Sequence, residues 1–110
     1  MALSGLHVVC AYFGGPGNGA AEGGFGAPQA VISDAVWSQT MATAGTTANA
    51  APSRSAEGGR PIFRIRASED VFVAVGADPD ASTGARYFVS ADADYDVFAS
   101  KGDKLAWVAA

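Results

Sequence analysis

The residues best suited to chemistry are two groups of aspartates placed at every second position. Asp78 and Asp80 form one group, and Asp92, Asp94 and Asp96 form the other. Carboxylates at alternate positions lie on one side of an extended chain, where their oxygens could bind a hard cation such as calcium. An EF-hand loop needs glycine at its sixth position and glutamate at its twelfth, but counting from Asp92 these positions hold valine and aspartate. We therefore expect solvated turn residues, with cation binding by the second group as the alternative.

Catalytic groups are scarce in the chain. His7 is the single histidine and Cys10 the single cysteine, so neither a nucleophilic triad nor a cysteine-based zinc site is supported. Three positions apart on an extended strand, these two side chains point to opposite faces. We expect a protein that is not an enzyme and has no cofactor. Cys10 is expected to be a small buried hydrophobic residue, with a disulfide between two chains as the alternative.

Aromatic residues indicate a further type of site, a platform on which sugar rings could stack. Trp37 and Trp107 could form one together with Tyr12, Tyr87 and Tyr95. In the strand pattern described below, however, Tyr95 and Trp107 fall on inward positions. Core packing is the preferred interpretation, and a carbohydrate-binding module remains an alternative function.

The charge distribution is uneven and argues against two classes of partner. The 110 residues carry seven basic and eleven acidic side chains, a net charge of −4. Every basic residue lies at Arg54 or beyond, and Arg64 with Arg66 is the nearest approach to a basic cluster. Nucleic acid is therefore not expected as a ligand. No apolar run reaches the ~18 residues of a membrane span, so no membrane association is expected.

Residues 61–110 alternate apolar and polar side chains in five short stretches separated by polar turns. A period of two is that of half-buried strands, and the short, even spacing is typical of an antiparallel sandwich. Tight turns are expected at residues 68–70 and 101–104, each joining two antiparallel neighbours. The sequence predicts an all-β fold, a small antiparallel β-sandwich or jelly-roll-like domain.

Residues 1–59 are expected to add a strand, loops and a Gly/Ala-rich extended region to this compact module, within a single domain of 110 residues. Residues 6–13 are apolar on both faces and are predicted to be a strand covered on both sides. Residues 35–42 are predicted to be a second strand, with its tryptophan and methionine on one face. Residues 14–28 are predicted to be a glycine-rich loop, and residues 43–59 an extended connection or arm.

Phenylalanines at outward positions define the candidate contact surface. Phe72, Phe88 and Phe98 fall opposite the valines of their strands, and as neighbours on an open face they would form an apolar patch that monomers tend to avoid. A second packed layer or an assembly interface is therefore expected there. The residues expected to make assembly contacts are Val9, Phe13, Phe25, Phe72, Phe88 and Phe98.

Residues 36–110 resemble a module of small structural proteins in tailed-phage virions. In these proteins a hairpin of the form RIxAxxDxxVAxGxxPxA is followed by a strand and by a terminal strand of the form GDKxAW. The stretch WSQTMATAGTTANAAP also resembles the threonine-rich connection that leads into the module. The matching positions are Ile65, Ala67, Asp70, Val73, Ala74, Gly76, Pro79, Ala81, Gly102, Asp103, Lys104, Ala106 and Trp107.

The resemblance implies a bacteriophage virion structural protein, in the first place a capsid decoration or cement protein that stabilises the head by subunit contacts. A component of the tail, the head–tail connector or a fibre is the alternative within the virion. The expected partners are the major capsid protein or other virion proteins. Further copies of the chain are also expected, since a thin, alanine-rich core would gain stability from association. The expected location is the virion, assembled in the host cytoplasm.

Overall fold

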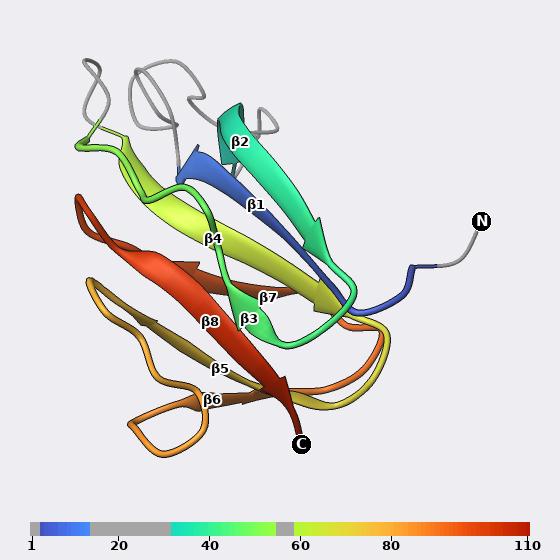
Figure 1. Ribbon diagram of the computed structural model, residues 1–110. Coiled ribbons are helices and arrows are strands. Elements are labelled where there is room, and N and C mark those ends of the chain that lie inside the picture. Colours follow the sequence, from blue (N-terminus) through green and yellow to red (C-terminus); the bar gives the residue numbers. More distant parts are fainter. Residues whose placement is uncertain (1–2, 14–31, 55–58) are drawn as a thin grey trace.

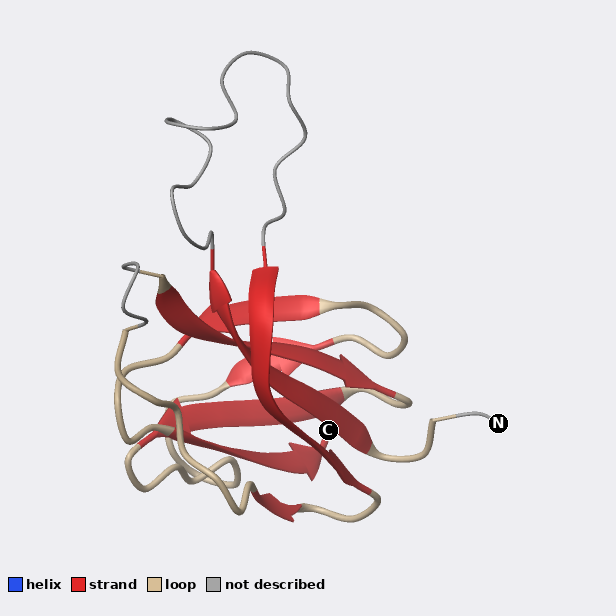
Figure 2. Cartoon of the chain, turned by 90° about the horizontal axis from the view of Figure 1, so that it is seen from above, coloured by secondary structure: helices blue, strands red, loops and turns tan. Residues whose placement is uncertain are grey.

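The computed structural model describes residues 3–13, 32–54 and 59–110, and the secondary structure in these ranges consists of β-strands (Figure 2). The strands are β1 Leu6–Phe13, β2 Ile32–Met41, β3 Gly45–Thr46, β4 Arg60–Ala67, β5 Val71–Gly76, β6 Tyr87–Val89, β7 Tyr95–Phe98 and β8 Lys104–Ala109. Residues 14–31, which include Phe25, and residues 55–58 lie outside the described part.

The strands form two four-stranded antiparallel sheets that face each other (Figure 1). Sheet A has the order β2-β1-β4-β7, and sheet B has the order β3-β8-β5-β6. Compared position by position, the two orders place β2 opposite β3, β4 opposite β5, and β7 opposite β6. A jelly roll has the same arrangement, except that its eighth and last strand along the chain occupies the position that β1 occupies here. The predicted all-β sandwich is confirmed.

The core lies between the sheets and is built from alternate residues of the central strands. The fully buried side chains that compose most of it are Leu6, Val8, Cys10, Phe63, Ile65, Val71, Val73 and Leu105. Trp107 is only 2% exposed and belongs to the same cluster. Trp37 packs its ring on Phe63, with 5.7 Å between the centroids, and donates its indole N–H to the carbonyl of Ala50 at 3.0 Å. Both tryptophans therefore serve the core.

The two expected turns do not join neighbouring strands, and this prediction is wrong. β4 pairs with β1 and β7 in sheet A, whereas β5 pairs with β6 and β8 in sheet B. Residues 68–70 therefore carry the chain from one sheet to the other, and the connection between β7 and β8 does the same. An apolar–polar period of two determines which side chains of a strand point inward. The same period precedes a hairpin within one sheet and a corner between two sheets, so it does not distinguish them.

The N-terminal strands are integral to the sandwich. β1 coincides with the predicted strand and lies between β2 and β4, while β2 begins three residues earlier than predicted. The described part of residues 43–59 is an extended connection, as predicted, but it is bound along β8. Its hydrogen bonds run from Thr47 N–H to the Leu105 carbonyl at 2.8 Å and from Ala51 N–H to the Asp103 carbonyl at 2.7 Å.

The two ends of the sandwich differ, and we call them the corner end and the loop end. At the corner end, residues 68–70 follow β4. There the Gly5 N–H donates to Ser68 Oγ at 3.0 Å, and the Ala110 N–H donates to the Asp70 carbonyl at 3.0 Å. At the loop end, β1 finishes at Phe13 and β4 begins at Arg60. Because Gly5 has φ +90° and a Cβ there would meet the Met41 carbonyl oxygen, only glycine fits this approach to the corner.

Candidate functional site

The described contact candidates form two aromatic pairs on opposite faces of the sandwich. Phe13 and Phe98 meet on the outer face of sheet A, with ring centroids 5.3 Å apart and planes at 77°. Phe72 and Phe88 meet on the outer face of sheet B, at 5.7 Å and 69°. The expectation that Phe72, Phe88 and Phe98 are neighbours is wrong, because β7 belongs to sheet A and the other two strands to sheet B. The core separates the two pairs.

The sheet A pair, Phe13 and Phe98, stands open at the loop end. Phe13 is 43% exposed and Phe98 is 46% exposed. Ile62, which is buried, lies beside Phe98 in the register of β4 and β7, and the side chains border a shallow hollow of about 110 Å³. The Arg60 guanidinium carbon lies 4.5 Å from the centre of the Phe98 ring, a cation–π contact. Edge-to-face aromatic rings beside an arginine are typical of protein contact surfaces.

The same face becomes charged toward the corner end. Val9, another predicted contact residue, is half-buried and lies opposite Arg64. Arg64 forms a bidentate pair with Asp96, with Nε–Oδ1 at 2.8 Å and Nη2–Oδ2 at 2.9 Å. This hydrogen bonding lowers the pKa of Asp96 and raises the pKa of Arg64. The outer face of sheet A thus passes from aromatic to ionic along the strands.

Asp94 and Asp96 explain why the aspartates recur at every second position. Arg66 pairs with Asp94 at 3.1 Å, one step along from the Arg64–Asp96 pair. The alternate spacing therefore gives Arg64 and Arg66 of β4 each a carboxylate on the outward face. Among the described residues, no group of three or more His, Cys, Asp or Glu side chains is placed to hold a metal ion.

His7 and Cys10 point to opposite faces, and neither is placed for catalysis. The His7 Nδ1 lies 2.7 Å from Thr40 Oγ1 on the outer face of sheet A. Cys10 is fully buried, as predicted, and burial raises the pKa of its thiol to about 11. A neutral thiol in the core is a poor nucleophile and offers no access for a disulfide with a second chain.

The connection between β5 and β6 folds into a hydrogen-bonded turn. The Asp80 carboxylate accepts hydrogen bonds from Thr83 Oγ1 at 2.8 Å, from the Ser82 N–H at 2.9 Å and from Ser82 Oγ at 3.0 Å. These bonds, that from the Thr83 hydroxyl first, lower the pKa of Asp80 to about 2. The carboxylate is thus occupied by its own turn.

This turn covers part of the outer face of sheet B. Ala81 is 3% exposed and packs against Ala74 and Ala106. Arg86 donates to the Ala81 carbonyl at 3.0 Å, and its guanidinium carbon lies 3.9 Å from the centre of the Phe72 ring. The chain therefore covers with its own loop some of the apolar surface of this face.

Tyrosines bridge the two sheets on the side where β6 and β7 are the edge strands. The rings of Tyr87 and Tyr95 lie 5.8 Å apart with their planes at 50°. Tyr87 is 43% exposed, and Phe88 beside it is 52% exposed. Tilted rings do not form the coplanar platform that sugar stacking requires.

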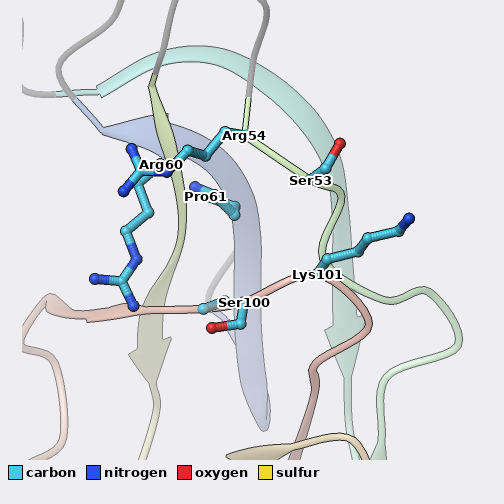
Figure 3. Close-up of a pocket in the computed structure, with 7 residues that line it drawn as sticks. Ser53, Arg54, Arg60, Pro61, Ser100 and Lys101 are labelled. Carbon is cyan, nitrogen blue, oxygen red and sulfur yellow. The ribbon is translucent and has the colours of Figure 1, made fainter.

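A cationic hollow at the loop end was not expected from the sequence (Figure 3). Its volume is about 540 Å³, and its lining residues are Ser53, Arg54, Arg60, Pro61, Ala99, Ser100 and Lys101. Figure 3 shows the two arginines on one side and Lys101 on the other. No local sequence pattern could indicate this cluster, because 47 positions separate Arg54 from Lys101.

Comparison with known proteins gives no match among protein-family models, curated proteins or solved structures. Within residues 3–13, 32–54 and 59–110, no helix has the length and apolar character needed to cross a membrane. The surfaces described above are therefore the basis on which a function can be inferred.

Proposed function

We propose that the protein is a structural component of a bacteriophage virion, a capsid decoration or cement protein that binds the head through the sheet A pair. The observation that carries this proposal is the exposure of Phe13 and Phe98, at 43% and 46%, side by side on the outer face of sheet A. Monomeric proteins tend to avoid neighbouring exposed aromatic rings, whereas contact surfaces are enriched in them. The phage-like motifs of residues 36–110 supply the class of partner, the major capsid protein.

The sheet A pair projects from strands that are hydrogen-bonded to β4, which favours an adhesive role. Phe13 ends β1 and Phe98 ends β7, and both strands pair with β4 between them. Fixed side chains lose little conformational entropy on binding, so more of the apolar burial appears as affinity. At roughly 25 cal/mol per Å² of apolar area, repeated modest contacts can reinforce a shell.

Two other functions remain to be distinguished by experiment. A tail, connector or fibre component would use the same contact chemistry against a different part of the virion. A carbohydrate-binding module has less support, because Trp107 is 2% exposed and Trp37 packs on Phe63.

The test is a titration of the purified protein onto separated heads and tails of the phage that encodes it. We expect binding to heads that saturates at a fixed ratio to the capsid subunit, read by sedimentation and quantitative gel analysis. Saturable binding to tails alone would support the alternative function, a component of the tail. Failure to bind either part, with retention on a polysaccharide column, would overturn the virion proposal.

A further inference from the structure

The cationic hollow has a buried floor and an exposed polar rim. Pro61 and Ala99 are buried, whereas Arg54, Arg60 and Lys101 are exposed. These are three of the seven basic residues of a chain whose net charge is −4, and among the described residues no acidic side chain lines the hollow. Cations concentrated on an otherwise acidic protein attract a negatively charged partner surface.

The corner end carries the opposite charge. Glu69, Asp70 and Asp92 are all exposed there. The backbone holds them in place, since the Asp92 N–H donates to the Ala67 carbonyl at 2.8 Å and Asp70 Oδ1 accepts from the Ala91 N–H at 2.9 Å. No salt bridge between described residues involves any of these three carboxylates, whereas Asp94 and Asp96 pair with arginines.

One strand keeps the two charged ends apart. β4 begins with Arg60 in the hollow and ends at Ala67, immediately before the acidic corner. An extended strand rises about 3.3 Å per residue, so its eight residues span about 25 Å. This distance exceeds the Debye length of about 8 Å at physiological salt. The two ends cannot neutralise each other within one molecule, but they can meet between molecules.

We propose that the cationic hollow binds the acidic corner, residues 68–70 with Asp92, of a second copy of this chain. The contact is head-to-tail, because the two surfaces lie at opposite ends of β4. Such heterologous contacts repeat into rings or filaments. A nucleic acid fits the hollow less well, since three cations on an acidic chain neutralise few phosphates. The proposal is independent of head binding, because it concerns the isolated protein.

The contact is expected to be weak and to depend on the salt concentration, because exposed ion pairs form it. Exposed ion pairs each contribute little and are screened as the salt concentration rises. We therefore expect self-association in dilute buffer that disappears at about 500 mM salt. On a particle, where copies lie side by side, the high local concentration favours the same contact.

The first experiment compares Lys101→Glu with Lys104→Glu by sedimentation velocity at about 50 mM salt. Both replacements change the net charge equally, but Lys104 does not line the hollow. We expect Lys101→Glu to weaken self-association about tenfold and Lys104→Glu to change it less than about twofold. Equal effects of the two variants, or no self-association of the wild type, would contradict the proposal.

The second experiment reverses the charge of the other surface. Glu69→Lys is expected to weaken self-association as Lys101→Glu does, whereas Asp78→Lys, on an exposed loop elsewhere, is the matched control. A mixture of the Glu69→Lys and Lys101→Glu proteins should associate again, because the intact hollow of one variant meets the intact corner of the other. The double variant should associate again through its exchanged charges.

Absence of both rescues would overturn the head-to-tail contact. A labelled oligonucleotide that binds the wild type but not Lys101→Glu, without any self-association, would assign the hollow to nucleic acid instead. Circular dichroism spectra and melting temperatures of the variants confirm that each one is folded. A failure here leaves the titration onto heads unaffected, and the two proposals can fail separately.

Discussion

The outer faces of the two sheets carry similar aromatic pairs, but the chain treats them differently. On sheet B, Ala81 and Arg86 of the β5–β6 connection fold over the strands, and Arg86 lies against Phe72. On sheet A, Phe13 and Phe98 remain 43% and 46% exposed, and the described residue that lies over the Phe98 ring is Arg60, at the rim of the hollow. A face that the chain covers itself serves stability. Phe88 on sheet B is nevertheless 52% exposed, so the contrast concerns the cover over Phe72 and the alanines, and the pair on sheet A is the surface that we propose for a partner.

The largest expected effect is on the covered face. Ala81→Glu would place a carboxylate against Ala74 and Ala106, where the present side chain is 3% exposed. We expect the free energy of unfolding to fall by about 2 to 3 kcal/mol, because the loop must leave the sheet to solvate the charge. Urea denaturation measures the loss.

Ala77→Glu is the matched control, since Ala77 is exposed in the same connection. We expect its unfolding free energy to lie within about 0.5 kcal/mol of the wild type. If the two variants lost the same stability, the loop would not be a structural cover for sheet B.

A smaller effect is expected from the two arginines that stack on phenylalanine. Arg86 combines its contact with Phe72 with hydrogen bonds to the carbonyls of Ala81 and Ser82, at 3.0 and 2.9 Å. Arg86→Ala should therefore lower the unfolding free energy by about 1.5 kcal/mol. Arg60→Ala, which removes a stacking contact only, should lower it by about 0.5 kcal/mol. Thermal unfolding of both variants compares them, and a reversed order would contradict the contrast between the faces.

The smallest effect concerns the ionic end of sheet A. Hydrogen bonding from Arg64 holds the pKa of Asp96 below its ordinary value in the folded protein. The resulting stability is present above the unfolded pKa of about 3.9 and is lost as the pH falls through the lower folded value. Because both side chains are more than a third exposed, the loss should be under about 1 kcal/mol. Asp96→Asn should show a smaller acid-induced loss than the wild type; an identical acid profile would assign no stability to the pair.

The sequence predicted the elements better than their arrangement. Alternation placed β1, β2 and the five C-terminal strands correctly and identified Trp107 as a core residue. It could not assign strands to sheets, because residues 68–70 look the same as a hairpin or as a corner. Phe98 was therefore grouped with Phe72 and Phe88, although it lies on the other sheet.

The candidate sites show the same limit. Five of the six predicted contact residues lie on outer faces of the sandwich, and Phe25 lies outside the described residues. The cationic hollow could not be predicted, since Arg54, Arg60 and Lys101 meet only when the β3–β4 and β7–β8 connections come together beside the start of β4. Local pattern determines which way a side chain points, whereas such clusters depend on pairing between distant strands.

The most direct test of the account compares Phe98→Ser with Phe88→Ser in binding to purified heads. Both phenylalanines are about half exposed, at 46% and 52%, so neither replacement should greatly change stability. If the open face of sheet A binds the particle, Phe98→Ser should lower the affinity about tenfold or more, and Phe88→Ser should change it less than about twofold. Loss of binding by Phe88→Ser with full binding by Phe98→Ser would contradict the account.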